Sequence, residues 1–143
     1  IFGIAITGLI LGYKCGFIAT LIYLVLGGIG MPVFAQFSGG ISVLFGPTGG
    51  FLLGYPLMAF IIGYFKEHFQ SHVLTVISMV VGLAIVYILG TIMFSLVTGN
   101  TIVQSLIYCV VPFVVLDLLK LVLAYTIGET VCKRVFSNLN LAK

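Results

Sequence analysis

The chain has 143 residues, of which 62% are hydrophobic and only 6% are charged, with a formal net charge of +3. Soluble domains carry about 25% charged residues, so this composition excludes a soluble domain. A transmembrane β-barrel would show alternating segments of about ten residues, whereas the apolar runs here are long and continuous. We therefore expect one all-α integral membrane domain spanning residues 1–143.

The chain opens inside an apolar run, residues 1–11, which is shorter than the ~20 residues that a membrane span needs. We interpret it as the end of a helix that starts further upstream, because no basic region or cleavage site indicates a signal peptide. The expected first segment, residues 2–12, is followed by a turn at Tyr13 and Lys14 and by a short helix over 15–26.

A glycine-rich stretch, residues 27–56, comes next. Eight of the 18 glycines lie between Gly27 and Gly50, and three of the four prolines lie between Pro32 and Pro56. A lipid-facing helix of this composition would leave backbone N–H and C=O groups unpaired in hydrocarbon. We expect the stretch to line a cavity, to re-enter the membrane against other helices, or to form a lid.

The rest of the chain reads as three apolar helices separated by polar turns. The first helix follows Gly50 and ends near Phe65, and the second and third are long enough to span with some tilt. Gly128 is the expected stop of the last helix. In order, the expected segments are a helix to about 65, a polar loop 66–72, a span 73–97, a turn 98–101, a span 102–127 and a polar tail 128–143.

Basic residues follow the alternation of these segments across the membrane. Lys14, Lys66, Lys133, Arg134 and Lys143 fall on one side, and the opposite side holds no Lys or Arg. Because basic residues accumulate on the cytoplasmic side, we expect a cytoplasmic C-terminus. The glycine-rich stretch then opens to the outside, where a solute to be imported would arrive.

Asp117 and Lys120 lie in the middle of the last span. Each ionisable group there costs about 2.5–3.5 kcal/mol on insertion scales, and their i, i+3 spacing places them on one helix face. One reading is a buried ion pair, or a contact to another helix, that only holds the bundle. The other is that both project into a polar cavity and share a ligand, helped by a kink at Pro112.

The glycine-rich stretch contains polar points and aromatic side chains that fit a binding pocket. Glycine lets backbone N–H groups approach a ligand closely, and hydroxyl groups add further donors. The alternatives are tight packing, turns and lipid contacts. The candidate polar residues are Ser38, Gly39, Gly40 and Thr48, and the candidate wall residues are Phe34, Phe37, Phe51 and Tyr55.

Other chemistry finds little support in the sequence. Cys15, Cys109 and Cys132 form no CxxC pattern, and His68 with His72 lacks further metal ligands. No GK[ST] follows the glycines, so they do not form a nucleotide-binding P-loop. We therefore expect no enzyme activity, no metal, no cofactor and no nucleic-acid partner.

Three stretches together resemble the BioY family, the biotin-specific substrate-binding (S) subunits of energy-coupling-factor (ECF) transporters. They are YLVLGGIGMPVFAQFSGG (23–40), GPTGGFLLGYP (46–56) and the pattern of Pro112, Asp117 and Lys120. The resemblance implies a six-helix membrane bundle whose first helix and most of the second lie upstream of Ile1. It also implies high-affinity biotin capture at a prokaryotic plasma membrane, together with a transmembrane coupling protein and two cytoplasmic ATPase subunits.

The resemblance also implies roles for individual residues. Asp117 and Lys120 would contact the ureido ring of biotin, under a roof formed by the loop from Gly30 to Gly46. The position matching Ser38 would lie near the valerate carboxylate. Some relatives carry a basic residue where this chain has Leu52, so backbone N–H groups and hydroxyls such as those of Ser38 and Thr48 would hold the carboxylate here. The rival interpretations are an S subunit for another small vitamin and a structural membrane scaffold.

Overall fold

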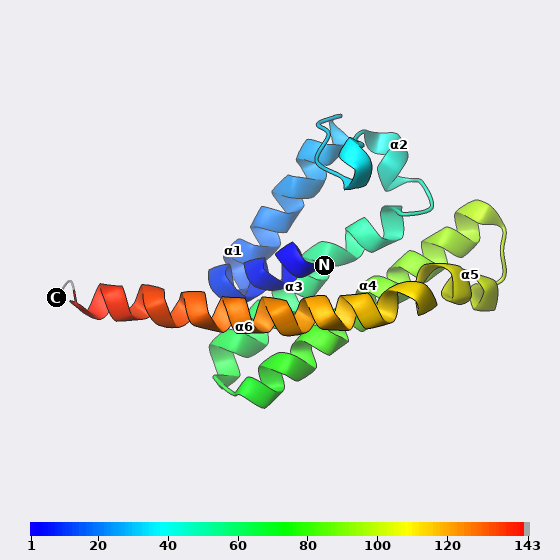
Figure 1. Ribbon diagram of the computed structural model, residues 1–143. Helices are drawn as coiled ribbons and strands as arrows, with labels where there is room; N and C mark the ends of the chain where they lie inside the picture. Colours follow the sequence, from blue (N-terminus) through cyan, green and yellow to red (C-terminus); the bar gives the residue numbers. More distant parts are fainter. Residues whose placement is uncertain (142–143) are drawn as a thin grey trace.

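The computed structural model describes residues 1–141, and its regular elements within this range are all helices (Figure 1). Within this part of the chain, four helices are long and apolar enough to cross a membrane: α1, α3, α4 and residues Val111–Val135 of α6. The predicted all-α membrane class is therefore confirmed. In order, the elements are α1 (Phe2–Gly28), the short 3-10 helix η1 (Ala35–Phe37), α2 (Ile41–Leu44), α3 (Gly49–Phe69), α4 (His72–Thr98), α5 (Ile102–Cys109) and α6 (Val111–Leu141).

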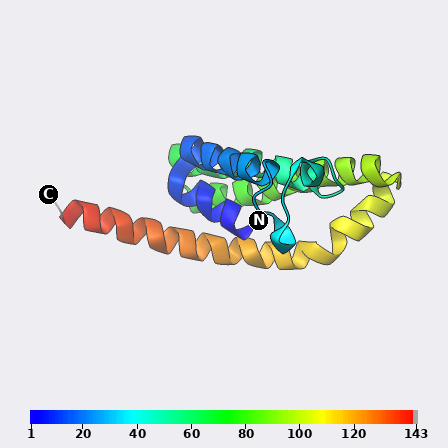
Figure 2. The ribbon, with the colours of Figure 1, turned by 90° about the horizontal axis from the view of Figure 1, so that it is seen from above.

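α3 is the central helix and packs against both α1 and α4 (Figure 1). α6 crosses one face of this layer, and its C-terminal part extends beyond the other helices (Figure 2). The largest buried cluster joins all four of these helices. It consists of Ala5, Leu9, Met58, Ile62, Met79, Leu83, Val86, Leu121 and Ala124.

Glycines bring these helices close together, as small residues do in membrane bundles. A Cβ added to Gly54 of α3 would lie 2.9 Å from the Cα of Val86 in α4. A Cβ added to Gly8 of α1 would lie 2.8 Å from the carbonyl oxygen of Ala59 in α3. Because these neighbours are backbone atoms, they have little freedom to give way.

We expect Gly54→Ala to lower the free energy of unfolding by about 1–3 kcal/mol, the usual cost of overpacking. The midpoint of unfolding by sodium dodecyl sulfate, followed by circular dichroism, measures this loss. Gly3→Ala is the matched control, because a Cβ at Gly3 meets no atom within 4 Å. Equal midpoints for the two variants would contradict the close packing of α3 on α4.

α1 is broken at Gly12, whose φ of 76° lies in the left-handed region that glycine favours. The break was predicted at Tyr13 and Lys14, so the position is wrong by one residue. The two parts fold toward each other, since a Cβ added to Gly16 would lie 3.4 Å from the Cα of Gly8. The second part begins at Tyr13, whose N–H donates to Oε1 of Glu67 at 3.1 Å, and a carboxylate stabilises a helix N-terminus.

Two of the predicted polar segments are instead helical. α3 continues to Phe69 and α4 begins at His72, so the loop predicted over 66–72 shrinks to Gln70 and Ser71. The helix also does not stop at Gly128, because α6 continues to Leu141. Gly128 instead allows close packing, since a Cβ there would lie 2.8 Å from Cδ1 of Leu9.

The single span predicted over 102–127 is wrong, because Val110 divides it into α5 and α6. Pro112 lies in the first turn of α6, where a helix needs no N–H from it. The turn predicted over 98–101 is confirmed. Gly99 ends α4 with a φ of 72°, and Thr101 caps α5 by accepting the N–H of Gln104 at 3.4 Å.

An ion pair and a hydrogen bond tie α6 to the helices on either side of the α3–α4 turn. Lys66 of α3 forms an ion pair with Glu129 of α6. Nδ1 of His72 lies 2.6 Å from the hydroxyl of Tyr125, which joins the start of α4 to α6. These contacts link the α3–α4 turn to α6 at the end of the bundle opposite the glycine-rich loop (Figure 1).

The glycine-rich stretch has two parts. Residues 29–48 form an irregular loop that contains η1 and α2, and α3 begins at Gly49 and includes Pro56. Phe34 anchors the loop in a buried cluster with Leu24 and Leu52. The hydroxyl of Tyr23 also donates to the loop at the carbonyl oxygen of Val33, at 3.1 Å. The loop therefore lies over the end of α1 and α3.

Candidate functional site

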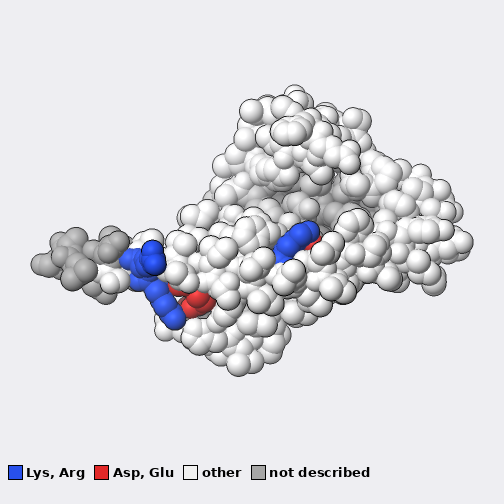
Figure 3. Space-filling view, in the orientation of Figure 1, with Lys and Arg blue, Asp and Glu red and all other residues white. Residues whose placement is uncertain are grey.

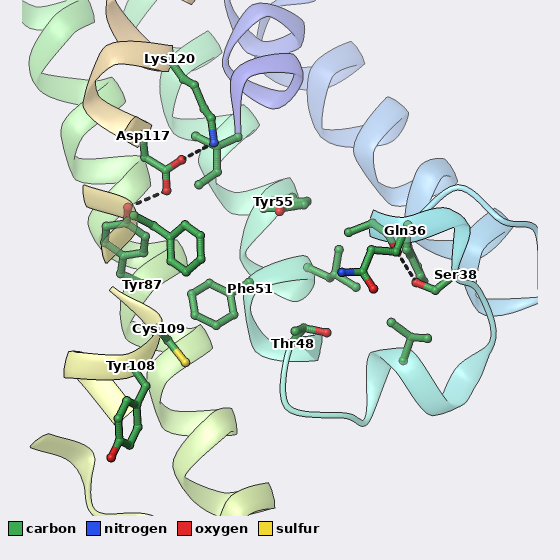
Figure 4. Close-up of a pocket in the computed structure, with 16 residues that line it drawn as sticks. Gln36, Ser38, Thr48, Phe51, Tyr55, Tyr87, Tyr108, Cys109, Asp117 and Lys120 are labelled. Carbon is green, nitrogen blue, oxygen red and sulfur yellow. Dashed lines mark hydrogen bonds and ion pairs between the residues drawn. The ribbon is translucent and has the colours of Figure 1, made fainter. Parts of the chain in front are cut away.

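A cavity of about 580 Å³ lies between the glycine-rich loop, the first turns of α3, α4 and the α5–α6 junction (Figure 4). Its volume falls within the roughly 300–1,000 Å³ of small-molecule pockets. Residues from across the sequence line it, namely Ile1, Phe34, Ala35, Gln36, Ser38, Val43, Thr48, Phe51, Leu52, Tyr55, Tyr87, Tyr108, Cys109, Phe113, Asp117 and Lys120.

Asp117 is the buried charge of this cavity, with only 3% of its surface exposed. Lys120, one turn later on α6, donates to its Oδ1 at 2.9 Å, and the hydroxyl of Tyr87 donates to its Oδ2 at 2.6 Å. Each carboxylate oxygen offers two lone pairs, so each keeps capacity for a further donor. Burial without a partner would be costly for this group, and these two contacts satisfy it.

Lys120 is more open than its partner, with 47% of its side chain exposed. Its ammonium group has three N–H donors, of which one reaches Asp117. Figure 3 shows charged side chains beside a hollow in the molecular surface, away from those nearer the C-terminal end. The pair therefore presents an acceptor and a donor together at one end of the cavity.

The middle of the cavity is aromatic and aliphatic. Phe51 and Tyr55 project from the first turns of α3, between the charged pair and the loop (Figure 4). Phe113 of α6 and Leu52 of α3 complete these walls. Such a surface buries an apolar ring or chain at roughly 25 cal/mol per Å² removed from water.

The far end of the cavity is polar and neutral. Gln36, Ser38 and Thr48 line it from the glycine-rich loop (Figure 4). The hydroxyl of Ser38 donates to the carbonyl oxygen of Ala35 at 2.7 Å. Gln36 has a φ of 59°, an uncommon conformation for a residue other than glycine. The cavity thus runs from a charged end, past apolar walls, to a neutral polar end.

Comparison with known proteins identifies the family. The model of the BioY family matches residues 1–137. The chain belongs to the BioY family. The biotin transporter BioY of Thermotoga maritima is 42% identical over 128 residues, covering 90% of this chain and 75% of that protein. The probable biotin transporter BioY of Pyrococcus horikoshii is 36% identical over 129 residues, with the same coverage.

The fold agrees with a solved structure of the same kind. A crystal structure of the S-component for biotin from an ECF-type ABC transporter matches with a TM-score of 0.86 and 30% sequence identity. The match covers 92% of this chain and 72% of that chain. The predicted BioY resemblance and the S-component fold class are therefore confirmed, and BioY is a transporter family and not a family of enzymes.

Five of the eight residues predicted to bind a ligand in this BioY-family chain line one cavity. They are Asp117, Lys120, Ser38, Thr48 and Tyr55. Lining a cavity is a position and not yet a contact with a ligand, so their roles stay predictions. The sequence left open whether Asp117 and Lys120 form an ion pair or face a cavity, and the structure has both arrangements at once.

The other three predicted residues lie in the loop but do not line the cavity. The side chain of Phe37 is on the surface, 89% exposed. Gly39 packs against the loop itself, since a Cβ there would lie 2.3 Å from the carbonyl oxygen of Met31. The N–H of Gly40 donates to the carbonyl oxygen of Gly27 at 2.6 Å. Contact of these residues with a ligand stays a prediction.

Sequence reasoning missed Tyr87, Gln36 and Cys109 as cavity residues. Tyr87 sits in an apolar run thirty positions before Asp117, so no spacing rule connects the two. The sequence offered only a general indication for Tyr87: a tyrosine hydroxyl inside a span needs a hydrogen-bond partner. Gln36, an amide within an otherwise apolar part of the glycine-rich stretch, was the clearer signal.

Proposed function

We propose that this chain is the membrane-embedded biotin-binding subunit of an ECF-type vitamin uptake transporter. Its membership of the BioY family, and the similarity to proteins named biotin transporter BioY, support this function. The similarity of its fold to the S-component for biotin supports it independently. The decisive observation in the chain itself is that Asp117 and Lys120 face a cavity from inside a membrane span.

The order of chemistry along the cavity matches the order along biotin. The ureido group at one end of biotin has N–H donors and a carbonyl acceptor, which suit the Asp117 carboxylate and the Lys120 ammonium group respectively. The fused rings and alkyl chain suit the apolar walls around Phe51 and Tyr55. The carboxylate then reaches the polar end near Thr48.

The glycine-rich loop, residues 29–48, acts as the movable roof of the site. It contributes Gln36 and Ser38 to the cavity, so it closes over any ligand that binds there. Gly30 and Gly40 have positive φ angles of 107° and 106°. Glycine adopts this conformation without steric cost, whereas any other residue type at these two positions would be strained. Loops of this kind admit a ligand by opening and exclude water by closing.

The site works within a larger assembly and has a defined orientation in the membrane. Lys66, Lys133 and Arg134 lie at the end of the bundle away from the cavity, which supports a cytoplasmic C-terminus and an outward-facing loop. A transmembrane coupling protein and two cytoplasmic ATPase subunits supply the energy for transport. The chain itself contributes capture of the vitamin.

Isothermal titration of the detergent-purified chain with a panel of water-soluble vitamins tests the function. We expect tight, saturable binding of biotin and no detectable heat from the other vitamins, because only biotin presents a ureido group to Asp117 and Lys120. Preference for another vitamin would identify an S subunit with a different cargo. Binding of none of them would favour a structural scaffold.

A further inference from the structure

All of the charge that lines the cavity lies at one end. Lys120 carries the single cationic side chain among the lining residues that the structure describes, and it already pairs with Asp117 at 2.9 Å. The remaining described basic residues, Lys14, Lys66, Lys133 and Arg134, are not among the lining residues. The Lys120 ammonium group is therefore paired with Asp117 at the end of the cavity opposite the loop.

The loop end offers neutral hydrogen-bonding groups instead. The Gln36 side chain extends from the loop toward α3 (Figure 4) and carries both N–H donors and a carbonyl acceptor. The hydroxyl of Thr48 both donates and accepts. The Ser38 hydroxyl donates to the Ala35 carbonyl oxygen at 2.7 Å, so it offers a ligand only acceptor capacity.

The proposal rests on the biotin-binding function above. We infer that the Gln36 and Thr48 end of the cavity accepts a neutral amide as readily as a carboxylate, so that amide conjugates of biotin are ligands of this chain. A carboxamide can donate to the Gln36 carbonyl and accept from its N–H groups. A carboxylate can use only the donors and finds no charged partner there.

The expected ratio between the affinities for biotin and for its amide follows from the hydrogen-bonding groups at the loop end. Hydrogen bonds in which one group is ionised are roughly twice as strong as those between neutral groups, which favours the carboxylate. Removing a carboxylate from water without a cationic partner offsets this gain, and none of the described lining residues at this end supplies a cationic side chain. α3 begins at Gly49, beside Thr48, and the partial positive charge of a helix N-terminus favours a carboxylate by only about two- to fivefold. Acid and amide should therefore bind within about tenfold of each other.

The loop end also has room for a longer substituent. Ala35 and Gln36 line the cavity and are nevertheless exposed on the surface. A group attached through the amide can therefore pass beside these residues to the outside without entering the buried part of the site. This geometry extends the ligand class from biotinamide to biotin joined by an amide bond to an amino acid, such as biocytin.

Isothermal titration of the purified full chain with biotin, biotinamide and biocytin tests the inference. We expect the dissociation constants of the two amides to lie within about tenfold of that of biotin. Tight binding of biotin with both amides weaker by more than tenfold would overturn the inference alone. Failure of biotin itself to bind would overturn the proposed function, and the inference with it.

A charge introduced at the loop end provides the complementary test. Gln36→Lys adds the missing cation and should raise the preference for biotin over biotinamide by about tenfold or more relative to the natural chain. Gln36→Glu is the matched reversal of similar length, and its negative charge should shift that preference the other way, toward biotinamide. An unchanged preference in Gln36→Lys would show that the ligand tail does not reach Gln36, contrary to the inference.

Discussion

Asp117→Asn is expected to weaken biotin binding by about 10- to 150-fold. A hydrogen bond to a charged group contributes about 1.5–3 kcal/mol, and tenfold in affinity corresponds to about 1.4 kcal/mol. The substitution weakens the acceptor for the ureido N–H groups. Tyr87 and Lys120 each donate to one oxygen of Asp117 in the natural chain. The NH2 group of asparagine cannot accept a hydrogen bond, so one of these two donors loses its acceptor.

Titration of the detergent-purified variant with biotin measures this loss. Glu129→Gln is a matched control, since it removes a second carboxylate from α6 that pairs with Lys66 and does not line the biotin cavity. We expect its affinity for biotin to equal that of the natural chain. Unchanged affinity in Asp117→Asn would remove this residue from the binding site, whatever the family.

Features that depend on the bilayer could be predicted from the sequence. Hydrocarbon requires every backbone group to be paired within a span, so long apolar runs identified the helices and the glycine-rich stretch identified the irregular loop. The same cost of charge in hydrocarbon identified Asp117 and Lys120, which line the cavity. These predictions needed no knowledge of which helices are neighbours.

Features that depend on neighbouring helices could not be predicted. Gly128 has the local pattern of a helix end, yet it lies within α6 because Leu9 from the start of the chain packs against it. The predicted loop over 66–72 became helical, and Glu67 instead accepts the N–H of Tyr13 beside the α1 break. In each case the deciding contact joins residues that are distant in the sequence.

The partner of Asp117 illustrates the same limit within the site. The scaffold interpretation requires the charged pair to lock two helices, but Lys120 and Asp117 lie on the same helix. The tie between helices runs instead from Asp117 to the hydroxyl of Tyr87 on α4. A polar lock and a ligand site therefore share one carboxylate, and they must be separated by experiment.

Lys120→Met combined with Asp117→Asn separates the two roles. Lys120→Met alone leaves the buried Asp117 carboxylate without its cation, and we expect a loss of about 1–2 kcal/mol in the free energy of unfolding. This is less than the roughly 3–5 kcal/mol for a fully buried pair, because 47% of the Lys120 side chain is exposed to solvent. The double variant has no unpaired charge, so we expect its stability to return to that of the natural chain.

Thermal unfolding with and without biotin distinguishes the outcomes. A ligand at 100 times its dissociation constant stabilises the folded state by about 2.7 kcal/mol, so the natural chain should unfold at a higher temperature when biotin is present. The double variant should be as stable as the natural chain without biotin and gain nothing from it, because Asp117 and Lys120 are the groups that read the ureido ring. If the pair served only to hold the bundle, the double variant would unfold earlier and would still respond to biotin.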